Sequence, residues 1–434
     1  MPDRWICPFC PLHCEDATIE PRSGGLPRLE PACPRGQAFV ERLDWDRQAP
    51  LPAELAGQPV AYEKAMAAAA ERLRRAPQIA IRGSFGGFSL GRSIVDFGES
   101  LGACLEPTTS VGQQALRRAI SRDGLISATL GDVRRYADLV LLIGQPELAY
   151  PRLLERFASD GLVAGRTRQR VSIELRDAAD RGAAPFALAE QPTARLAVSP
   201  AELAVLIAQW QRTDEPSAAP PALAPELTAR LHRAEYIAVI LGPDAFAPWG
   251  LLGGELEAAG LLAAVARWNR HRRAVLVASD ASASFRQVAV WRSGFAGPVG
   301  WNQNRPFPLE RGGFARLWDA PETVRLEIAV PAAPYWPNER TADADAADAG
   351  AAGGDSADEA APADILLASE GVAGASGRTA SIVLPIAAPG VDTADTVVRG
   401  KGSVTLPLRH LRRPLEPTLP ETLAALAAAA GRQP

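Results

Sequence analysis

The chain has 434 residues, of which 47% are hydrophobic and 22% charged, a composition typical of globular proteins and a length sufficient for two or three buried cores. Its formal net charge is −4, and 46 Lys and Arg residues are mixed with 50 Asp and Glu residues, so no basic stretch indicates a nucleic-acid partner. The longest apolar runs are far shorter than a membrane span, and no transmembrane segment is expected.

Four of the five cysteines lie near the amino terminus, at Cys7, Cys10, Cys14 and Cys33. Three closely spaced thiols followed by a distant fourth are commoner for a 4Fe-4S cluster than for zinc, which often uses two separated CxxC pairs. Zinc remains the alternative, with His13 as a further candidate ligand. Disulfides are not expected, because the start of the chain lacks the features of an export signal. The protein is therefore expected in the cytoplasm.

A stretch rich in proline and small residues at 48–59 is interpreted as a linker that ends the cysteine-rich part near residue 55. A strand at 78–83, preceded by a helix at 62–75 and followed by one at 90–101, is predicted next. The loop after this strand contains Gly83, Gly86 and Gly87. A glycine loop at a helix start can present N–H groups to a phosphate, although a tight turn explains the glycines equally well.

Strands and helices continue to alternate along the chain. Residues 138–144 form a continuous apolar run that ends in Gly144, as expected for a parallel strand buried on both faces. Further strands are predicted at 103–106, 170–175, 236–242, 273–279, 365–368 and 381–385, and further helices at 201–212, 224–233, 253–268 and 420–431. The alternation predicts an α/β fold with parallel sheets in two intertwined lobes.

These patterns divide the chain into five segments. We predict a small cysteine-rich metal subdomain, two α/β lobes separated by a proline-rich break, an acidic insertion, and a carboxyl-terminal segment that completes the lobes. The predicted boundaries are 1–55, 56–213, 226–340, 341–363 and 364–434. The insertion has low complexity and almost no large apolar side chains, so it is expected to be disordered.

Taken together, the motifs resemble the B-type subunit of formylmethanofuran dehydrogenase, a member of the molybdopterin oxidoreductase superfamily. The resemblance runs through most of the chain and is carried by residues 6–16 (ICPFCPLHCED), 32–36 (ACPRG), 137–144, 380–385 and 400–402. It implies a molybdopterin-oxidoreductase-like fold with a 4Fe-4S cluster on the four cysteines. It also implies that Arg35 and Gly36 lie between cluster and pterin, and that an active member would bind pterin phosphates through loops such as 83–87 and 144–147.

The resemblance breaks at the active-site metal. Catalytic members hold molybdenum or tungsten with two pterin dinucleotides and a cysteine thiolate. In the corresponding segment of this chain, residues 106–114, Gly112 replaces the cysteine and Gln113 replaces the neighbouring histidine. A soft metal ligand and a proton-transfer group are therefore missing. Cys104 would need a different backbone path to take over the ligand role.

The same loss is found in the B-type member of the bacterial formyltransferase/hydrolase complex, which this chain resembles most. That complex converts formyl-tetrahydromethanopterin to formate through a methanofuran-type carrier without redox chemistry. The resemblance implies a scaffold with no catalytic residues, partners of A, C and D type, and no molybdenum, tungsten or pterin. The alternatives are an active molybdenum or tungsten dehydrogenase of formylmethanofuran or formate, and an electron-transfer module in which only the cluster works.

Two further groups of residues have no assigned role. The chain contains no HExxH, GxSxG or P-loop motif. The basic group at 271–273 is either a solvated helix end or a site that faces an anion. Trp291, Trp301 and Trp318 lie among polar residues in a turn-rich region, and we predict a protein interface there, since tryptophan is enriched at interface hot spots.

Overall fold

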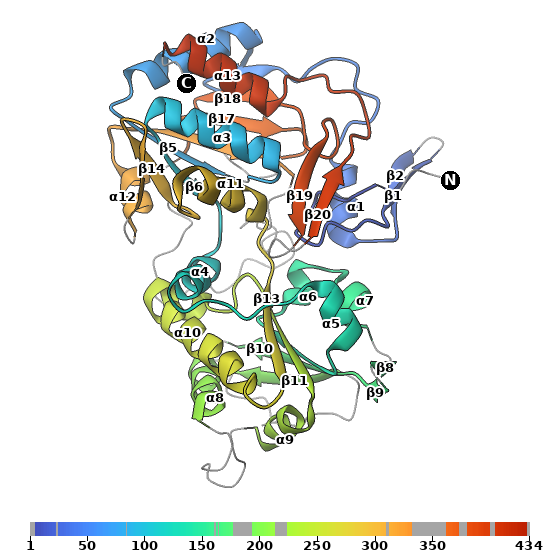
Figure 1. The fold of residues 1–434 in the computed structure, drawn as a ribbon. Helices are drawn as coiled ribbons and strands as arrows, with labels where there is room; N and C mark the ends of the chain where they lie inside the picture. The colour runs from blue at the N-terminus through green and yellow to red at the C-terminus, as the bar shows by residue number, and fades with distance from the viewer. Residues whose placement is uncertain are drawn as a thin grey trace, which may run out of the picture. The chain divides into compact units, whose positions relative to one another are not determined.

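The computed structural model describes residues 5–22, 25–83, 85–159, 162–163, 165–176, 193–212, 224–309, 312–331, 362–372, 380–399 and 404–431. The chain forms two compact units (Figure 1). Unit 1 comprises Met1–Thr108 and Ala281–Pro434, and unit 2 comprises Thr109–Asp280. Each unit contains a parallel or largely parallel sheet with helices packed against it, so the predicted α/β class is confirmed.

Unit 2 is built on a sheet whose strands all run parallel. Its order is β11 (Thr193–Val198), β10 (Gln169–Leu175), β7 (Leu139–Ile143), β12 (Tyr236–Leu241) and β13 (Arg273–Ala278). All five residues of the central strand β7 are buried, as its continuous apolar sequence predicts. The helices are α4 (Val111–Asp123), α5 (Leu130–Tyr136), α6 (Pro146–Ala149), α7 (Leu153–Phe157), α8 (Pro200–Arg212), α9 (Pro225–Arg233) and α10 (Gly250–Trp268), with a 3₁₀ turn η1 (Ala247–Trp249) and a short hairpin of β8 (Leu162–Val163) and β9 (Arg166–Thr167).

One helical stretch in the described part of the chain, residues 247–268, is long and apolar enough to cross a membrane by length and composition alone. This stretch comprises η1 and α10. Helix α10 packs against α4 and α8, and its side chains Leu261 and Val265 belong to the buried core of unit 2. Core packing therefore explains part of its apolar composition, since 33% of the apolar window is buried.

Unit 1 contains a larger sheet with a parallel centre. Its order is β15 (Arg305–Pro308), β14 (Val299–Asn302), β6 (Cys104–Pro107), β5 (Gln78–Gly83), β16 (Thr323–Ala329), β17 (Ile365–Ser369), β18 (Ile382–Ile386), β3 (Ala53–Leu55) and β4 (Gln58–Val60). Strands β6 to β18 in this order are parallel. The outer pairs at both edges are antiparallel.

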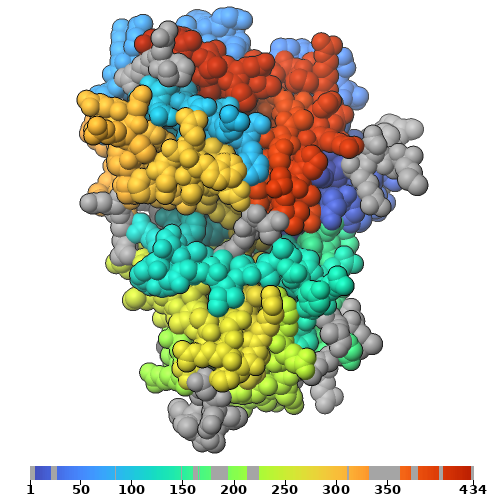
Figure 2. Space-filling view, in the orientation of Figure 1, coloured from blue at the N-terminus to red at the C-terminus, as the bar shows by residue number. Residues whose placement is uncertain are grey.

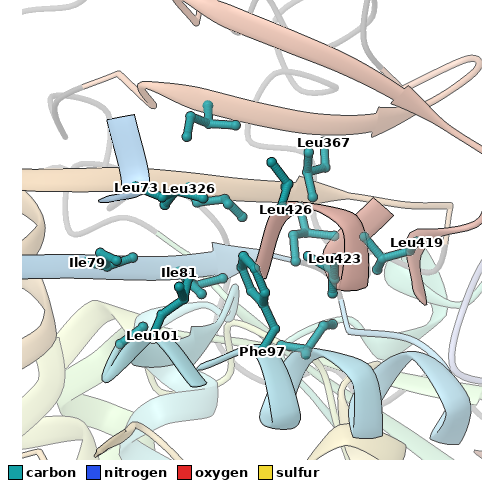
Figure 3. Packing of buried hydrophobic residues seen from close by; sticks show 14 of the residues in the cluster. Leu73, Ile79, Ile81, Phe97, Leu101, Leu326, Leu367, Leu419, Leu423 and Leu426 are labelled. Atoms are coloured by element: carbon teal, nitrogen blue, oxygen red, sulfur yellow. The ribbon is translucent and has the colours of Figure 1, made fainter. Parts of the chain in front are cut away.

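Alternate residues of β5 face two different layers of helices. Ile79 and Ile81 pack in the main core with α2 (Tyr62–Arg75), α3 (Phe88–Leu101) and α13 (Leu419–Ala429), as Figure 3 shows. Ala80 packs in a separate cluster with Trp318 of α12 (Gly313–Asp319). This period of two is the signature of a strand covered on both faces. A further helix, α11 (Ala283–Ser293), packs on α3.

The cysteine-rich amino terminus belongs to unit 1. It consists of the cysteine loop, a hairpin of β1 (Thr18–Arg22) and β2 (Gly25–Glu30), and helix α1 (Pro34–Glu41). A second hairpin, β19 (Asp395–Arg399) with β20 (Val404–Leu408), comes from the other end of the chain. Figure 2 shows these carboxyl-terminal segments in red against the amino-terminal segment in blue. The beginning and the end of the chain thus build one region.

The predicted linker at 48–59 is not a linker. Its residues form β3 and β4, and β3 pairs antiparallel with β18. The two compact units also cut across the predicted segments, because residues 56–213 and 226–340 each contribute to both units. The reason is the pairing of distant strands, such as β5 with β16, which a reading of local composition cannot detect. Apart from its last two residues, the predicted insertion at 341–363 lies outside the described residues.

A buried ion network joins the residues after α1 to the carboxyl-terminal part of unit 1. Arg47 donates to Glu370 at 3.0 Å and forms an ion pair with Glu416. Arg412 pairs with Glu370 and, at 2.6 Å, with Asp392. Burial alone would raise the pKa of Glu370, but the Asp44 N–H and Arg412 more than offset it, so the pKa lies below its usual value. The carboxylate therefore contributes stability at neutral pH that is lost only in acid.

Replacing Arg412 tests this network. Arg412→Ala leaves the carboxylates of Glu370 and Asp392 buried without that partner, and we expect a loss of about 3–5 kcal/mol in the free energy of unfolding. The matched control is Arg413→Ala, which removes the same charge from an exposed neighbour and should change little. Urea denaturation of both variants measures the difference. Equal stability of the two variants would show that the network contributes nothing.

Candidate functional site

Three of the four candidate metal ligands lie on one tight loop. The N–H of Cys7 donates to the carbonyl of Cys14 at 3.0 Å, and the N–H of His13 donates to the carbonyl of Cys10 at 3.1 Å. His13 takes a left-handed conformation with a φ of 41°, which turns the chain back on itself. The side chains of Cys7, Cys10 and Cys14 are buried, each residue being 6% exposed. The sequence motif thus folds into a compact loop that gathers its thiols.

The fourth cysteine stands at the start of a helix. Cys33 is the N-cap of α1 and is only partly buried. A Cβ atom on Gly36 would lie 3.8 Å from the Cys33 sulfur and only 2.4 Å from a methyl carbon of Leu29. Glycine at this position is therefore explained by close packing against Leu29.

The thiols influence one another electrostatically. Burial raises the pKa of Cys7 well above its usual value, and the neighbouring Cys10, Cys14 and Cys33 raise it further. Burial also raises the pKa of Cys10, which Arg35 opposes. A raised pKa keeps a thiol protonated at neutral pH, and a bound cation would favour the thiolate instead. Nevertheless, no three His, Cys, Asp or Glu side chains in the described residues are grouped as a ready site for one metal ion.

Arg35 and His13 hold the cysteine loop by its backbone. The Nε–H of Arg35 donates to the carbonyl of Phe9 at 3.2 Å. Nδ1 of His13 lies 3.3 Å from the carbonyl oxygen of Cys7 and donates to it in the matching tautomer. Burial, with a smaller effect of Arg399, lowers the pKa of His13 to about 4, so the imidazole is neutral at physiological pH. This contact gives His13 a structural role that does not require a bound metal.

The carboxyl-terminal part of unit 1 fixes the same loop from outside. Arg399 of β19 donates to the carbonyls of Leu12 and His13, both at 2.8 Å. The indole N–H of Trp5 donates to the carbonyl of Gly390 at 2.8 Å. Neither Arg399 nor Gly390 carries a sequence signal for this role, because they lie more than 380 residues away along the chain. Of the motif at 400–402, no residue is among the described residues.

The glycine loop before α3 encloses a carboxylate of the protein itself. Asp395 of β19 accepts the N–H groups of Ser89 at 2.9 Å and Leu90 at 3.3 Å. A Cβ atom on Gly87 would lie 2.0 Å from this carboxylate, and one on Gly83 would lie 2.0 Å from the carbonyl oxygen of Ile328. Both glycines, and the buried Gly86 between them, are thus part of close packing. The helix end that a phosphate would use is taken by Asp395.

Close packing also explains Gly144 at the end of β7. Strands β7 and β12 are neighbours whose chain connections leave in opposite directions across the sheet, the usual place for a ligand in an open α/β sheet. The carbonyl oxygen of Gly144 would lie 1.9 Å from a Cβ atom on Gly242, and a Cβ atom on Gly144 would lie 2.7 Å from Ala245 Cα. The two strand ends therefore pack on each other through backbone.

Gly112 faces the same segment of unit 2. It is the second residue of α4, and a Cβ atom there would lie 2.9 Å from the N of Ala247, 3.0 Å from the O of Pro243 and 3.2 Å from the N of Phe246. These contacts are backbone atoms, which cannot move aside as a flexible side chain can. The position that carries a cysteine ligand in the family the sequence resembles has no space here for any side chain.

The residues beside Gly112 are also used for structure. The hydroxyl of Ser110 accepts the N–H of Gln113 as the N-cap of α4 and donates to the carbonyl of Pro243 at 2.6 Å. The amide of Gln113 donates to the carbonyl of Ser279 at 3.2 Å. Cys104 lies in β6 of unit 1, and burial raises its pKa to about 11. Its thiol is therefore protonated at neutral pH and is a poor metal ligand in that state.

The predicted interface role of two tryptophans is wrong. Trp301 is 4% and Trp318 is 2% exposed, and the guanidinium of Arg82 stacks 3.9 Å above the Trp318 ring. Both side chains belong to the cores of unit 1. Their polar neighbours in the sequence give no indication of this burial. Only Trp291 of this trio is exposed, at 67%, and it stacks on Phe88 with ring centroids 5.5 Å apart.

Comparison with known proteins adds a likeness in fold. No protein-family model matches the chain, and no curated protein matches it in sequence. Among solved structures it is similar to a chain in the crystal structure of the formyltransferase/hydrolase complex (FhcABCD) from Methylorubrum extorquens in complex with methylofuran. The TM-score is 0.65 with 21% identity over 87% of this chain and 98% of that chain. This likeness confirms the fold and leaves the function to be argued.

The space around Gly112 can be tested directly. We expect Gly112→Ala to lower the free energy of unfolding by about 1–3 kcal/mol, because the added methyl group clashes with fixed backbone. Gly131→Ala is the matched control. Gly131 is also the second residue of a capped helix, α5, and a Cβ atom there meets nothing closer than the Thr129 hydroxyl at 3.4 Å.

Thermal and urea unfolding, followed by circular dichroism, measure both variants. Gly131→Ala should be neutral or slightly stabilising, since alanine favours helix. If Gly112→Ala were equally well tolerated, the position would have room for a side chain. The same clash applies to Gly112→Cys, so reintroducing the cysteine is not expected to recreate a metal site.

Proposed function

We propose that this chain is a non-catalytic scaffold subunit of a formyltransferase/hydrolase-type complex of one-carbon metabolism. The complex would convert formyl-tetrahydromethanopterin to formate through a methanofuran-type carrier. The observation that carries the proposal is the packing at Gly112, where backbone atoms of residues 243–247 fill the space of the expected metal ligand. A chain that cannot hold this ligand would serve the complex through its fold and its contacts with partner subunits.

Two further observations favour a subunit without pterin. The N–H groups at the start of α3 are bonded to Asp395 rather than left for a phosphate. The glycines at the ends of β7 and β12 are in backbone contact. The residues of these loops therefore do not fit a pterin dinucleotide, and no redox step is assigned to the chain. These contacts also disfavour the alternative of an active molybdenum or tungsten dehydrogenase.

The chemistry of the four cysteine residues suits a metal centre. We propose that Cys7, Cys10, Cys14 and Cys33 hold a 4Fe-4S cluster, with Arg35 and Gly36 beside it. The spacing of the four cysteines supports a cluster over zinc, and Cys10, Cys14 and Cys33 lie close enough to Cys7 to raise the pKa of its thiol. When bound, the cluster would cross-link the cysteine loop to α1 and neutralise the gathered thiolates. Its proposed role here is structural.

The partners follow from the proposed complex. The similar solved structure is an assembly described as FhcABCD and bound to methylofuran. We propose that this chain assembles with partners of A, C and D type and that those partners carry the formyl transfer and the hydrolysis. We expect the complex in the cytoplasm, where thiols stay reduced; none of the described cysteines forms a disulfide.

Metal and pterin analysis of protein purified without oxygen tests the proposal. We expect about four iron atoms per chain and no molybdenum, tungsten or pterin. Cys14→Ser should lose most of the iron, whereas the matched control Cys104→Ser, which changes the cysteine outside the motif, should keep it. Co-purification with partners of A, C and D type tests the assembly in the same preparations.

Each outcome of this experiment has a distinct meaning. Zinc near one atom per chain would leave the scaffold proposal intact and would show that the cysteines bind zinc in place of a cluster. Molybdenum or tungsten together with pterin would overturn the scaffold proposal and give the chain a redox role. If the protein contained iron but did not associate with the partners, the chain would not be a subunit of the complex.

A further inference from the structure

Helix α10 carries apolar side chains on the side that points to solvent. Residues 252, 256, 259 and 263 follow the i, i+4, i+7, i+11 spacing that places side chains on one face of a helix. Leu252 is 58% and Leu256 is 68% exposed. Ala263 is also exposed, and Ala259 is half-buried. These four residues, named here the α10 stripe, form a face without polar side chains over about three helical turns.

The core of unit 2 does not explain the α10 stripe. Helix α10 packs on α4 and α8, and it contributes other residues, such as Leu261 and Val265, to the core. A surface helix normally carries charged or polar side chains on the face that points to water. The α10 stripe is thus an apolar face that no described residue of the chain covers.

A membrane is a poor partner for this face. Insertion of the whole helix would remove Leu261 and Val265 from the core of unit 2. A helix that lies on a membrane surface is usually rich in Lys and Arg beside its apolar face. The only charged residues between 252 and 263 are Glu255 and Glu257, which anionic lipids repel. The α10 stripe therefore favours a protein partner.

The order of large and small residues makes the α10 stripe complementary to itself. Two antiparallel copies of α10, related by a two-fold axis between residues 257 and 258, place Leu252 opposite Ala263 of the second copy. The same axis places Leu256 opposite Ala259 of the second copy. Each large side chain then meets a small one, which is the pattern that lets facing helices interdigitate without voids. Two-fold contacts of this kind are the commonest in homo-oligomers.

The size of the α10 stripe also indicates which partner it fits. Its eleven-residue span gives a helix face of about 17 Å by 10 Å. This area is well below the roughly 800 Å² per partner of a standard stable interface, and obligate subunit interfaces are larger still. A weak, reversible contact between two copies of this chain therefore fits the stripe better than a permanent contact with a different subunit.

We propose that the α10 stripe is a self-association surface, through which two copies of this chain form a weak dimer with two-fold symmetry. Helix α10 packs antiparallel on its counterpart in the second copy, with each leucine of the stripe against an alanine. In the proposed complex this contact would join two assemblies through their scaffold chains. The surface itself depends neither on the cysteine centre nor on the proposed scaffold function.

Analytical ultracentrifugation of the full-length protein at increasing concentration tests the dimer. The average mass should rise from the monomer value of 45.9 kDa toward twice that value, with a dissociation constant on the order of 100 µM. Leu256→Ser should weaken the dimer at least about tenfold, because two-fold symmetry removes two buried leucines at once. The matched control is Val290→Ser, which changes an aliphatic residue of α11 that is 44% exposed, and it should leave the dimer unchanged.

A size swap tests the pairing of leucine with alanine. Ala263→Leu adds apolar surface, yet it should weaken the dimer because the new leucine meets Leu252 of the second copy. The double variant Leu252→Ala with Ala263→Leu restores a large residue opposite a small one and should recover the dimer. Unspecific hydrophobic association predicts the opposite for Ala263→Leu, namely a tighter dimer. Circular dichroism confirms that each variant is folded.

Four results would overturn the proposal. The protein could remain a monomer at about three times the expected dissociation constant, or it could form a dimer that Leu256→Ser does not affect. Binding to phosphatidylcholine and phosphatidylglycerol vesicles that Leu256→Ser abolishes would assign the stripe to a membrane. A monomer that Leu256→Ser destabilises toward urea would show that the stripe packs within its own chain. None of these results depends on iron content or on the A, C and D type partners, so the proposed function is tested separately.

Discussion

The bonds that Arg399 makes to the cysteine loop are the contact on which the candidate metal centre depends. A loop that turns within eight residues cannot satisfy all its carbonyls internally, and buried carbonyls without a donor are costly. Arg399 donates to two of them, at Leu12 and His13. The indole of Trp5 and the ion network around Glu370 attach the flanking residues to the same part of unit 1. The thiols keep their arrangement because the far end of the chain holds their backbone.

The glycines have a different structural role in this protein from the one that the sequence motifs predict. Gly87, Gly112 and Gly144 come from loops that in the resembling family serve a cofactor. In this chain each glycine is required because protein atoms occupy the space next to it: a carboxylate at Gly87, and backbone at Gly112 and Gly144. Close packing therefore accounts for all three glycines.

The sequence predicts the parts of the structure whose signal is local. The run Leu139–Ile143 is apolar throughout and forms the buried strand β7, and most predicted helices and strands agree with the structure to within a few residues. Features that depend on distant partners have no such signal. Asp395 looks like an ordinary strand residue until β19 meets α3. Residues 48–59 look like a linker because the partner of β3 lies in β18.

The closure of the amino-terminal region by the last part of the chain has a consequence for synthesis. The cysteine loop is synthesised more than 380 residues before Arg399, which holds its backbone. Segments that are made early commonly fold first during translation, but here the loop can reach its native form only after Arg399 has been made. The final arrangement of the four cysteines is therefore reached late, when both parts of unit 1 are present.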